Sequence, residues 1–508
     1  MARNKDSVLT PELRRTSSVV VLGSIMSILD TTIVAVALAT LARDFHVSIT
    51  TIQWVTTGYL LALSVVIPVT GWAVDRFGAK RVWMLSLVLF IIGSSLCGVA
   101  WSANSLIAFR VLQGIGGGML LPVGQSILAR ASGPQRMGRV MSIIGVPMVM
   151  GPILGPVIGG LIVSNFSWRW IFYINVPIGI FTLVLSQRWL DDTEERIRGG
   201  FDTLGFCLLS PGLTSLVFSL AEVGTTGSFT STPVLISFVL GLGLMGAFIW
   251  HALRARNPLL ELKLFKNRNF SIANICIFVL GATLFGSMFL LPLYYQIARG
   301  QSPWQAGLLM APQGIGAAFI MRWAGSVTDK VGPRRVVPFG IVLMGIATIP
   351  FAFVTGNTNE IWLAVTLFIR GLGLGLTMMP ITAAAYFDLN HAQIPRASTT
   401  MNIIRQVGGS IATALFAVVL ERTIISNLGG HLTTAGTANM LSSNVKLPAR
   451  VADPVAAAFA HTFWWAVATI FLAFIPTLFL PNRGAKSPTG TGASEGEEIE
   501  MSVALLAE

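Results

Sequence analysis

The stretch GWAVDRFGAKR at residues 71–81 recurs as GSVTDKVGPRR at residues 325–335. Both copies read G-x-x-x-D-[RK]-x-G-x-[KR]-R, and their shared aspartates are 254 residues apart. A second pair, LQGIGGG at 112–118 and IRGLGLG at 369–375, recurs at nearly the same spacing. Two motifs that repeat in the same order at nearly one spacing indicate that the chain consists of two homologous halves.

The composition of the 508 residues is that of a membrane protein. Hydrophobic residues make up 53% of the chain, charged residues make up 11%, and the mean hydropathy is +0.73. A soluble protein is about 25% charged. Apolar runs of about 20 residues, each long enough to cross a hydrocarbon layer about 30 Å thick, recur along the whole chain. We count fourteen such spans, near residues 17–40, 52–74, 81–101, 105–129, 139–164, 169–189, 202–222, 232–252, 270–292, 304–327, 335–355, 361–386, 398–420 and 459–480.

These spans predict an all-α integral membrane protein. Lipid offers the backbone no hydrogen-bond partners, and the runs are too long and too continuous for the strands of a closed barrel. The repeated motifs assign six spans to each half and leave two spans inserted between the halves. The predicted divisions are a cytoplasmic N-terminus (1–16), an N-terminal six-helix half (17–190), a linker with two extra transmembrane helices (191–256), a C-terminal six-helix half (257–482) and a disordered cytoplasmic tail (483–508).

The distribution of positive charge predicts the orientation of the chain in the bilayer. With the N-terminus inside, 24 of the 34 Lys and Arg residues belong to inner segments, and only 6 belong to outer segments. Inner segments are the ones that carry such an excess. An even number of spans then places both termini in the cytoplasm and the chain in the cell membrane. The net charge of +12 is scattered over short loops, which argues against nucleic acid as a partner.

No motif in the sequence indicates an enzyme, a metal site or a bound cofactor. The three cysteines lie in apolar runs without metal-ligand spacing, and the five histidines are scattered. We find no pairing of a nucleophile with a histidine and no phosphate-binding lysine motif, so ATP is not the expected energy source. A membrane-embedded enzyme or a receptor is the weaker alternative, because no large soluble domain accompanies the spans.

An aspartate interrupts the first span, in SILDTTIVAVALAT at residues 27–40. A carboxylate at the centre of a membrane helix costs about 2.5–3.5 kcal/mol on insertion scales, so Asp30 needs a partner or a function. In the fourth span, Arg110 and Gln113 lie one turn apart on one face, and such an arginine can hold or release a carboxylate. Two interpretations stay open. Asp30, with Thr31 beside it, is either a static hydrogen-bonded carboxylate or a functional one: a proton carrier, a counter-ion for a cationic substrate, or both.

The first copy of the repeated motif combines packing glycines with charged residues. Gly71 lets a neighbouring helix approach, and Gly78 permits a tight turn. Asp75 lies at a helix end, where it could accept backbone N–H groups of another helix or pair with an arginine. Arg76 and Arg81 are either cytoplasmic anchors or parts of a gating loop. The residues assigned to this gating loop and to its second copy are Gly71, Asp75, Arg76, Gly78, Arg81 and Asp329.

Small residues form a stripe along the fifth span. Gly151, Gly155 and Gly159 are four residues apart and therefore follow one face of the helix, while prolines among them bend it. Such a helix packs tightly against a partner and can rock on it. The residues themselves indicate a structural interface of small residues. The residues assigned to this helix face are Gly151, Gly155, Pro156, Gly159 and Gly160.

These motifs resemble those of the major facilitator superfamily. GWAVDRFGAKR, present in two copies, is similar to the signature of that superfamily, and RVLQGIGGG at 110–118 resembles its fourth-helix motif. GPILGPVIGG at 151–160 resembles the motif of the drug:proton antiporters, and LDTTIVAVALA at 29–39 resembles the first-helix motif of their fourteen-span branch. The resemblance implies the major facilitator fold, with two six-helix halves and two inserted helices. It also implies that the glycine-rich fifth span is an antiporter helix, which seals the route between the halves.

The same resemblance implies a proton-coupled efflux transporter that exports lipophilic, cationic drugs or related amphiphiles by alternating access. Protons would be the coupling ion, no cofactor is expected, and the monomer would be the functional unit in the lipid bilayer. Two alternatives stay open: export of a lipid, siderophore or endogenous metabolite, and proton-coupled import of a nutrient. Aromatic residues near span ends are often interface anchors. The candidates for the lining of the substrate cavity are Trp54, Tyr59, Asn274, Tyr295 and Arg405.

Overall fold

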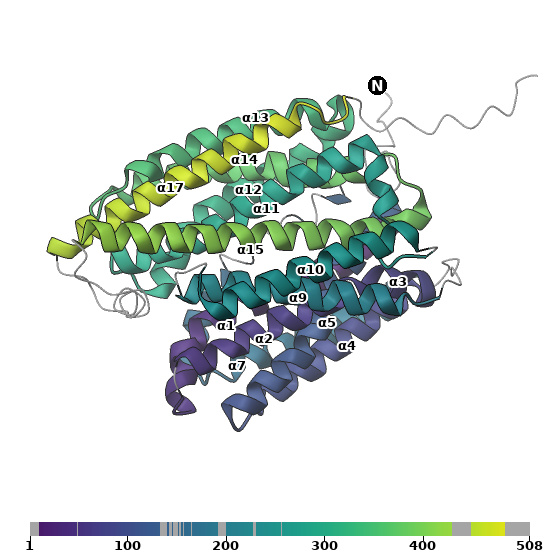
Figure 1. The fold of residues 1–508 in the computed structure, drawn as a ribbon, viewed down its shortest axis with the longest axis horizontal. Coiled ribbons are helices and arrows are strands. Elements are labelled where there is room, and N and C mark those ends of the chain that lie inside the picture. The colour runs from purple at the N-terminus through teal and green to yellow at the C-terminus, as the bar shows by residue number, and fades with distance from the viewer. Residues whose placement is uncertain are drawn as a thin grey trace, which may run out of the picture.

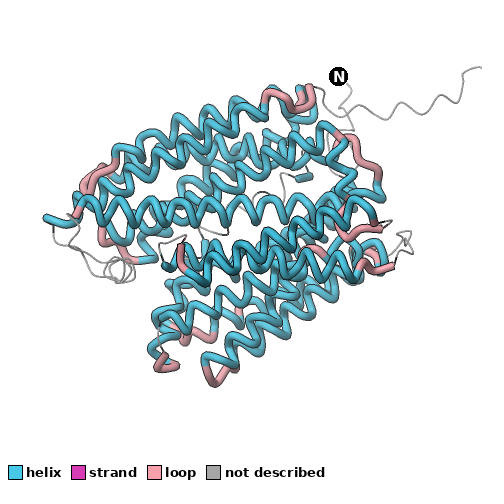
Figure 2. Tube along the Cα trace, viewed as in Figure 1, coloured by secondary structure: helices cyan, strands magenta, loops and turns pink. Residues whose placement is uncertain are grey.

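The chain is helical throughout the part that the computed structural model describes. Within that part it contains no β-strand, which confirms the predicted all-α fold (Figure 2). The predicted N-terminus up to residue 9 and the predicted tail from residue 483 lie outside the described residues. The model describes residues 10–47, 49–132, 140, 141, 145, 151, 154, 155, 157–163, 165–191, 200–226, 230–255, 257–428 and 449–482.

The helices before residue 190 form an N-terminal bundle around the long helix α5. α5 packs against α1, α2 and α4, and α8 packs against α1 and α4. Glycines allow this close approach, since a Cβ at Gly93 of α4 would lie 2.6 Å from Gln113 Cα of α5. In chain order the helices are α1 (Pro11–Asp44), α2 (Ile49–Val66), α3 (Val69–Phe77), α4 (Ala79–Gly98), α5 (Ala103–Ser132), α7 (Trp170–Tyr173) and α8 (Asn175–Trp189).

The second predicted span is bent. α2 and α3 meet at an angle of 54°, and Pro68 lies at the break, where its ring restricts the backbone. α3 ends at Gly78, whose φ of 86° is a conformation that other residues rarely adopt. Gly332, in the second copy of the repeated motif, has a φ of 85°. Both copies therefore form the same turn.

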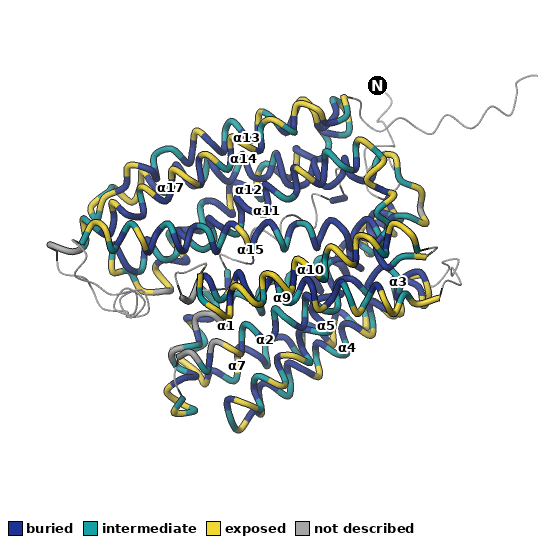
Figure 3. The backbone as a smooth tube through the Cα atoms, in the orientation of Figure 1, coloured by how far each residue is buried: buried dark blue, intermediate teal, exposed yellow. Residues whose placement is uncertain are grey.

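Two helices, α9 (Thr203–Thr226) and α10 (Thr232–Arg254), follow the N-terminal bundle and pack against each other. α9 also contacts α2 and α15, and Ser210 Oγ donates a hydrogen bond to Val65 O of α2 at 2.9 Å. α10 exposes most of its length (Figure 3), as expected of an apolar helix that faces lipid.

The helices after residue 257 form a C-terminal bundle. Within it, α14 packs against α12 and α13, and α11 packs against α15 and α17. The segment η4 is a π-helical turn that continues α11. In chain order the elements are η3 (Leu262–Lys266), α11 (Arg268–Leu293), η4 (Tyr294–Ala298), α12 (Pro303–Val331), α13 (Pro333–Thr348), η5 (Ile349–Phe353), α14 (Glu360–Tyr386), η6 (His391–Gln393), α15 (Ile394–Asn427) and α17 (Ala449–Thr477).

Figure 1 shows the two bundles converging near α3 and diverging towards the opposite end. At the converging end α15 packs against α3 and α5. A Cβ at Gly71 of α3 would lie only 3.3 Å from Arg396 Cα of α15, so the backbones nearly touch there. The domain boundaries predicted from the sequence are not tested by this arrangement and stay predictions.

Among the described residues, eleven helices are long and apolar enough to cross a membrane, and the bent pair of α2 and α3 would be a twelfth. The predicted span at 304–327 corresponds to α12, a continuous helix of 29 residues. The predicted span at 139–164 lies largely outside the described residues. The membrane-protein fold class is confirmed, and the count of fourteen spans stays a prediction.

Candidate functional site

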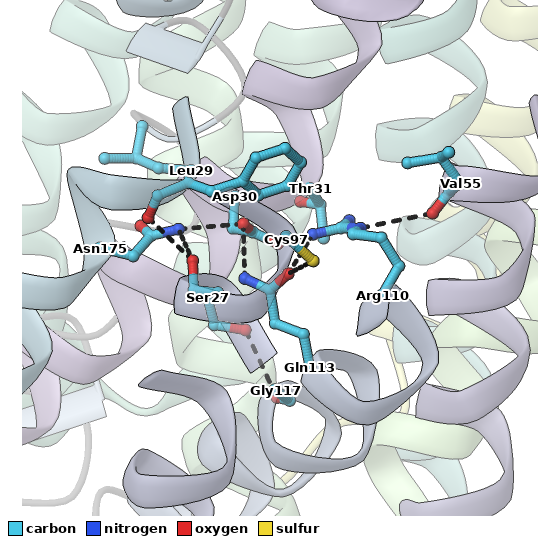
Figure 4. A network of polar contacts seen from close by, with 12 residues as sticks. Ser27, Leu29, Asp30, Thr31, Val55, Cys97, Arg110, Gln113, Gly117 and Asn175 are labelled. Atoms are coloured by element: carbon cyan, nitrogen blue, oxygen red, sulfur yellow. Dashed lines mark hydrogen bonds and ion pairs between the residues drawn. The ribbon is translucent and has the colours of Figure 1, made fainter. Parts of the chain in front are cut away.

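The polar residues predicted in the first and fourth spans meet inside the N-terminal bundle (Figure 4). Asp30 and Arg110 are fully buried, and Arg110 Nη1 donates to Asp30 Oδ2 at 2.5 Å. Gln113 Nε2 donates to the other carboxylate oxygen, Oδ1, at 2.9 Å. Gln113 Oε1 accepts a hydrogen bond from Arg110 Nη1 at 2.7 Å. These three side chains form a closed hydrogen-bonded ring, which we call the Asp30 ring.

Asn175 is a further partner of Asp30 that is not among the residues predicted from the sequence. Its Nδ2 donates to Asp30 Oδ1 at 3.0 Å and to Ser94 Oγ at 3.1 Å. Ser94 Oγ donates in turn to Phe172 O at 2.9 Å. The signal for Asn175 in the sequence is an amide inside the apolar run INVPIG at 174–179. A neutral side chain in such a run is a weaker signal than a charged one.

Arg110 keeps other contacts besides the carboxylate. Its Nε donates to Val55 O of α2 at 3.3 Å, and its guanidinium carbon lies 4.1 Å from the centroid of the Tyr59 ring. A cation over an aromatic face is stabilised by about 0.5–2 kcal/mol. Nη2 is buried and has no hydrogen-bond partner among the described residues. Arg110 would therefore still be held by α2 if its bond to Asp30 opened.

Helix geometry explains why these side chains meet. Arg110 and Gln113 are three residues apart on α5, so they project from the same face. Asn175 is the first residue of α8, directly after the single turn of α7. Gly117, one turn beyond Gln113, leaves room for the Tyr59 hydroxyl, which a Cβ at this position would contact. The glycines of α5 thus place α2 beside the Asp30 ring.

The Asp30 ring links the charge of Asp30 to the position of an arginine. Removing one member of a buried ion pair leaves an uncompensated charge and costs about 3–5 kcal/mol. A proton on Asp30 would have the same consequence, because Arg110 would lose its counter-charge. The protonation of Asp30 and the position of Arg110 are therefore physically linked.

Thr31 does not join the Asp30 ring. Its Oγ1 donates to Ile28 O of its own helix at 2.7 Å, a local bond that is common for threonine in membrane helices. Ser27, one turn before Asp30, donates across to Gly117 O of α5 at 3.3 Å. The polar side chains of this part of α1 thus have three kinds of partner. Asp30 belongs to the Asp30 ring, Ser27 bonds to a neighbouring helix, and Thr31 bonds to its own helix.

Asp75 of the gating loop forms an ion pair between the two bundles. Asp75 is 5% exposed, and Arg396 Nε of α15 donates to its Oδ2 at 3.1 Å. Arg130 Nη2 of α5 lies 3.9 Å from the other oxygen. Arg396 Nη1 also lies 3.9 Å from a carboxylate oxygen of Glu261. We call the pair of Asp75 and Arg396 the latch, because it joins the bundles at their converging end.

The other residues predicted for the gating loop are neighbours of Asp75 in the sequence or belong to the second copy of the repeated motif. Gly71 faces α15, where a Cβ would lie 3.2 Å from Thr399 Oγ1. Arg76 and Arg81 are exposed, which is compatible with cytoplasmic anchors and with parts of a gating loop. Asp329 is half-buried near the end of α12 in the C-terminal bundle.

The glycine stripe of the fifth predicted span packs against α1. A Cβ at Gly151 or Gly155 would collide with Ile28 or Thr32, and Thr32 Oγ1 donates to Gly151 O at 3.2 Å. Gly159 continues the contact, with a Cβ position 3.1 Å from a backbone oxygen of α1. The contacts of the stripe therefore begin next to Asp30.

The same span also reaches the C-terminal bundle. A Cβ at Gly160 would lie 3.6 Å from Trp304 Cβ of α12. At the other end of the span, a Cβ at Gly145 would lie 2.6 Å from Met379 of α14 and 2.9 Å from Met321 of α12. Pro156 lies outside the described residues. The described positions of this span thus touch both bundles.

Comparison with known proteins identifies the family. The family model described as the Major Facilitator Superfamily matches residues 20–413. The chain belongs to the Major Facilitator Superfamily. It is therefore a multi-pass membrane protein of a transporter family, as its apolar helices already indicated.

Relatives within the superfamily cover nearly the whole chain. The multidrug resistance protein B homolog of Mycobacterium tuberculosis (strain ATCC 25618 / H37Rv) is 40% identical over 490 residues, which cover 93% of this chain and 91% of the relative. The multidrug export protein EmrB of Escherichia coli (strain K12) is 33% identical over 399 residues, which cover 78% of this chain and 77% of EmrB. A crystal structure of a double-tryptophan mutant of XylE is similar in fold, with a TM-score of 0.61 at 12% identity and coverage of 93% of this chain and 97% of that one.

In this member of the superfamily the candidate cavity residues lie in different places. Trp54 is 44% exposed and stacks on Phe218 of α9, with ring centroids 6.1 Å apart. Tyr59 lies under Arg110, as described above. Asn274 is buried and donates to Phe270 O of its own helix at 2.8 Å.

Two further cavity candidates belong to the C-terminal bundle. Tyr295 is buried in the π-helical turn η4, with its ring 5.4 Å from that of Tyr294. Arg405 is buried on α15 and lines a pocket of that bundle. The structure therefore brings Tyr59 to the Asp30 ring and separates the other four from it. No group of three or more potential metal ligands occurs among the described residues.

Proposed function

We propose that this chain is a proton-coupled efflux transporter, an antiporter that exports lipophilic drugs or related amphiphiles by alternating access. One observation carries the proposal: the fully buried ion pair of Asp30 and Arg110, closed by Gln113. An ionisable residue inside a membrane bundle is expensive and marks a proton or substrate pathway. The names of the relatives, a multidrug resistance protein B homolog and a multidrug export protein, support drug export as the activity.

In the proposed cycle, a proton from the outer side neutralises Asp30 and releases Arg110. Arg110 then relies on Val55 and Tyr59 of α2, and the contacts between α1, α2 and α5 change. The latch of Asp75 and Arg396 keeps the converging end closed in the described state. Opening of the latch gives the other access state, in which the proton leaves and a substrate enters from the inside.

The proposed setting is the plasma membrane, with the monomer as the functional unit and both termini in the cytoplasm. The excess of Lys and Arg in the inner segments supports this orientation. With that orientation, the converging end of the bundles is cytoplasmic, and the described state is closed to the cytoplasm. Transport needs the two bundles of one chain, the bilayer and protons, so no cofactor enters the proposal.

The test uses everted membrane vesicles and a panel of neutral, cationic and anionic fluorescent amphiphiles. An exporter driven by protons accumulates at least one member of the panel when the vesicle interior is acidic, whereas a nutrient importer accumulates none. Asp30→Asn should insert and fold but lose accumulation driven by the pH gradient. Asp191→Asn, which removes an exposed carboxylate after α8, is the matched control and should transport normally. Unchanged accumulation by Asp30→Asn, with the pH gradient as sole driving force, would contradict the role of Asp30.

Host-cell compounds are the alternative substrates. Export of a lipid, siderophore or endogenous metabolite would give the same vesicle result with a different panel. Growth of an exporter-deficient host, with and without this chain, against cationic, neutral and lipidic toxins separates these substrates from drugs. Protection against none of the toxins, together with normal insertion, would favour an endogenous substrate.

A further inference from the structure

A second buried arginine lines a pocket in the C-terminal bundle, away from the Asp30 ring. Arg405 of α15 is 6% exposed and forms the polar end of this pocket. The other walls come from α11 and α14 and are almost entirely apolar. Besides Gly281 and Thr382, they are formed by Ile277, Leu280, Leu284, Leu374 and Met378.

The guanidinium of Arg405 has unused hydrogen-bonding capacity. Its Nη1 donates to Asn402 Oδ1 at 3.2 Å, and no carboxylate of the described residues forms an ion pair with it. An arginine carries five N–H donors and stays charged. A buried charge without a counter-charge is unfavourable unless a partner arrives. The pocket therefore presents free donors and an uncompensated positive charge beside an apolar wall.

Arg370 adds to this positive charge. It is 3% exposed, and its partners are neutral: Nη1 donates to Gln313 Oε1 at 2.5 Å, Nε donates to Thr348 Oγ1 at 3.1 Å, and Nη2 donates to a serine hydroxyl. Leu374, a pocket residue, follows Arg370 on α14 by one helical turn. Asp30 does not compensate the charges of Arg370 and Arg405, because it is already paired with Arg110 and both of its oxygens are bonded within the N-terminal bundle.

In the described state this pocket has room for about one water molecule. We propose that it widens when the bundles move and then binds the acidic head of an amphiphilic substrate: a carboxylate, sulfonate or phosphate monoester held by Arg405, with the apolar tail against the leucine and methionine walls. The proposal rests on the proposed export function and names its substrate class. A planar guanidinium binds such oxyanions through two parallel N–H bonds. Met378 is flexible enough to accept tails of different shape. The charge sign is opposite to the cationic substrate expected from Asp30 alone.

The head-group pocket also connects to the contact between the bundles. Asn402, which accepts the bond from Arg405, donates through Nδ2 to Gln125 Oε1 of α5 at 2.8 Å. α5 is the helix that carries Arg110 and Gln113 of the Asp30 ring. An anion that takes over Arg405 Nη1 removes the bond to Asn402. Binding of an anion in the pocket would therefore free Asn402 and change its contact with α5, the helix that carries Arg110 and Gln113.

The test compares two probes with the same tail and opposite heads, pyrenebutyrate and pyrenebutyl-trimethylammonium. Binding to the full-length protein in zwitterionic nanodiscs is measured by fluorescence anisotropy, with empty nanodiscs subtracted and without a pH gradient. Arg405→Gln should weaken pyrenebutyrate at least tenfold and leave the ammonium probe within twofold. Arg405→Lys should retain part of the anion affinity, because it keeps the charge and loses the fork of donors. Arg422→Gln, which removes an exposed charge from the same helix, is the matched control and should bind as wild type does.

Two results would overturn the head-group pocket: equal weakening of both probes by Arg405→Gln, or no binding of pyrenebutyrate by the wild type. Thermal unfolding of each variant identifies a loss of structure, and Arg405→Lys then decides the outcome for a correctly folded protein. The export proposal is tested by a different measurement, the accumulation of a dye in energised vesicles, so the two proposals can fail independently. Anion binding without accumulation would disprove export and leave the pocket intact.

Discussion

Asp30 and Arg110 show how a charge is kept inside a membrane bundle. Each carboxylate oxygen accepts at least one hydrogen bond, and the arginine is shared between the carboxylate, an amide and a backbone carbonyl. Lysine at position 110 could not make these contacts, because an ammonium group is a compact charge without a planar fork. The arginine is therefore needed for its shape as well as for its charge.

Variants of Asp30 and Arg110 should distinguish the contribution of the ion pair to protein stability from its contribution to transport. Arg110→Gln leaves Asp30 without its counter-charge and should lower the free energy of unfolding in mixed micelles by about 3–5 kcal/mol. Asp30→Asn with Arg110→Gln removes both charges and should recover most of that loss. Neither variant should accumulate a dye in response to a pH gradient. A double variant as unstable as Arg110→Gln would show that the two charges are not coupled.

The charged members of the Asp30 ring could be predicted from the sequence, because a charge in an apolar span stands out. Asn175 could not, since a single neutral amide gives no comparable signal. The partner of Asp75 was also open, because Arg396 is 321 residues away and several arginines were equally available. Arg370 is a related case: its motif was visible, but its neutral partners come from three other helices.

At the scale of the element, the fifth predicted span links the surroundings of Asp30 to the interface between the bundles. Its glycines lie against α1 on the turns next to Asp30, and its ends touch α12 and α14. Without side chains on this face, the span follows α1 closely and can rock against it. A movement of α1 around Asp30 is thus passed to a helix that contacts the C-terminal bundle.

A single methyl group on this face should test the role of the glycine stripe. Gly155→Ala places a Cβ against Thr32 Oγ1 and should reduce proton-driven accumulation at least tenfold, because the span is pushed away from α1. Gly243→Ala on α10 is the matched control, since no atom lies within 4 Å of the added Cβ. Both variants are compared at equal membrane abundance. Normal accumulation by Gly155→Ala would show that close packing of the stripe is unnecessary.

The helices themselves were largely predictable, because apolar runs of about 20 residues leave no other structure in lipid. The breaks within them were not. Pro68 marks the place of the break between α2 and α3, but its angle of 54° and the separate turn of α7, which packs against α1 and α4, are not written in the local sequence. Such local departures are set by neighbours that are distant in the sequence.

At the scale of the whole molecule, the latch and the packing of Gly71 hold the bundles together at their converging end. Alternating access requires this end to separate in part of the cycle. A covalent bond at the same place should therefore stop transport while leaving the protein folded.

Gly71→Cys with Thr399→Cys, in a chain whose native cysteines are replaced by serine, supplies that bond. The position of Thr399 Oγ1, 3.2 Å from a Cβ at Gly71, suits a disulfide. Oxidation should reduce vesicle accumulation to the background level, and dithiothreitol should restore it. Each single-cysteine variant is the control and should be insensitive to the oxidant. Full transport by the cross-linked protein would mean that the bundles do not part at this end.

The two bundles are related by an internal repeat but differ electrically. In the N-terminal bundle the buried arginine has its carboxylate, whereas Arg370 and Arg405 of the C-terminal bundle have no carboxylate partner among the described residues. A full crossing of a 100 mV membrane potential is worth about 2.3 kcal/mol for each elementary charge. If the bundles rock as proposed, Arg370 and Arg405 would move in that field without a carboxylate partner beside them. We therefore expect the membrane potential, as well as the proton gradient, to influence which side of the transporter is open.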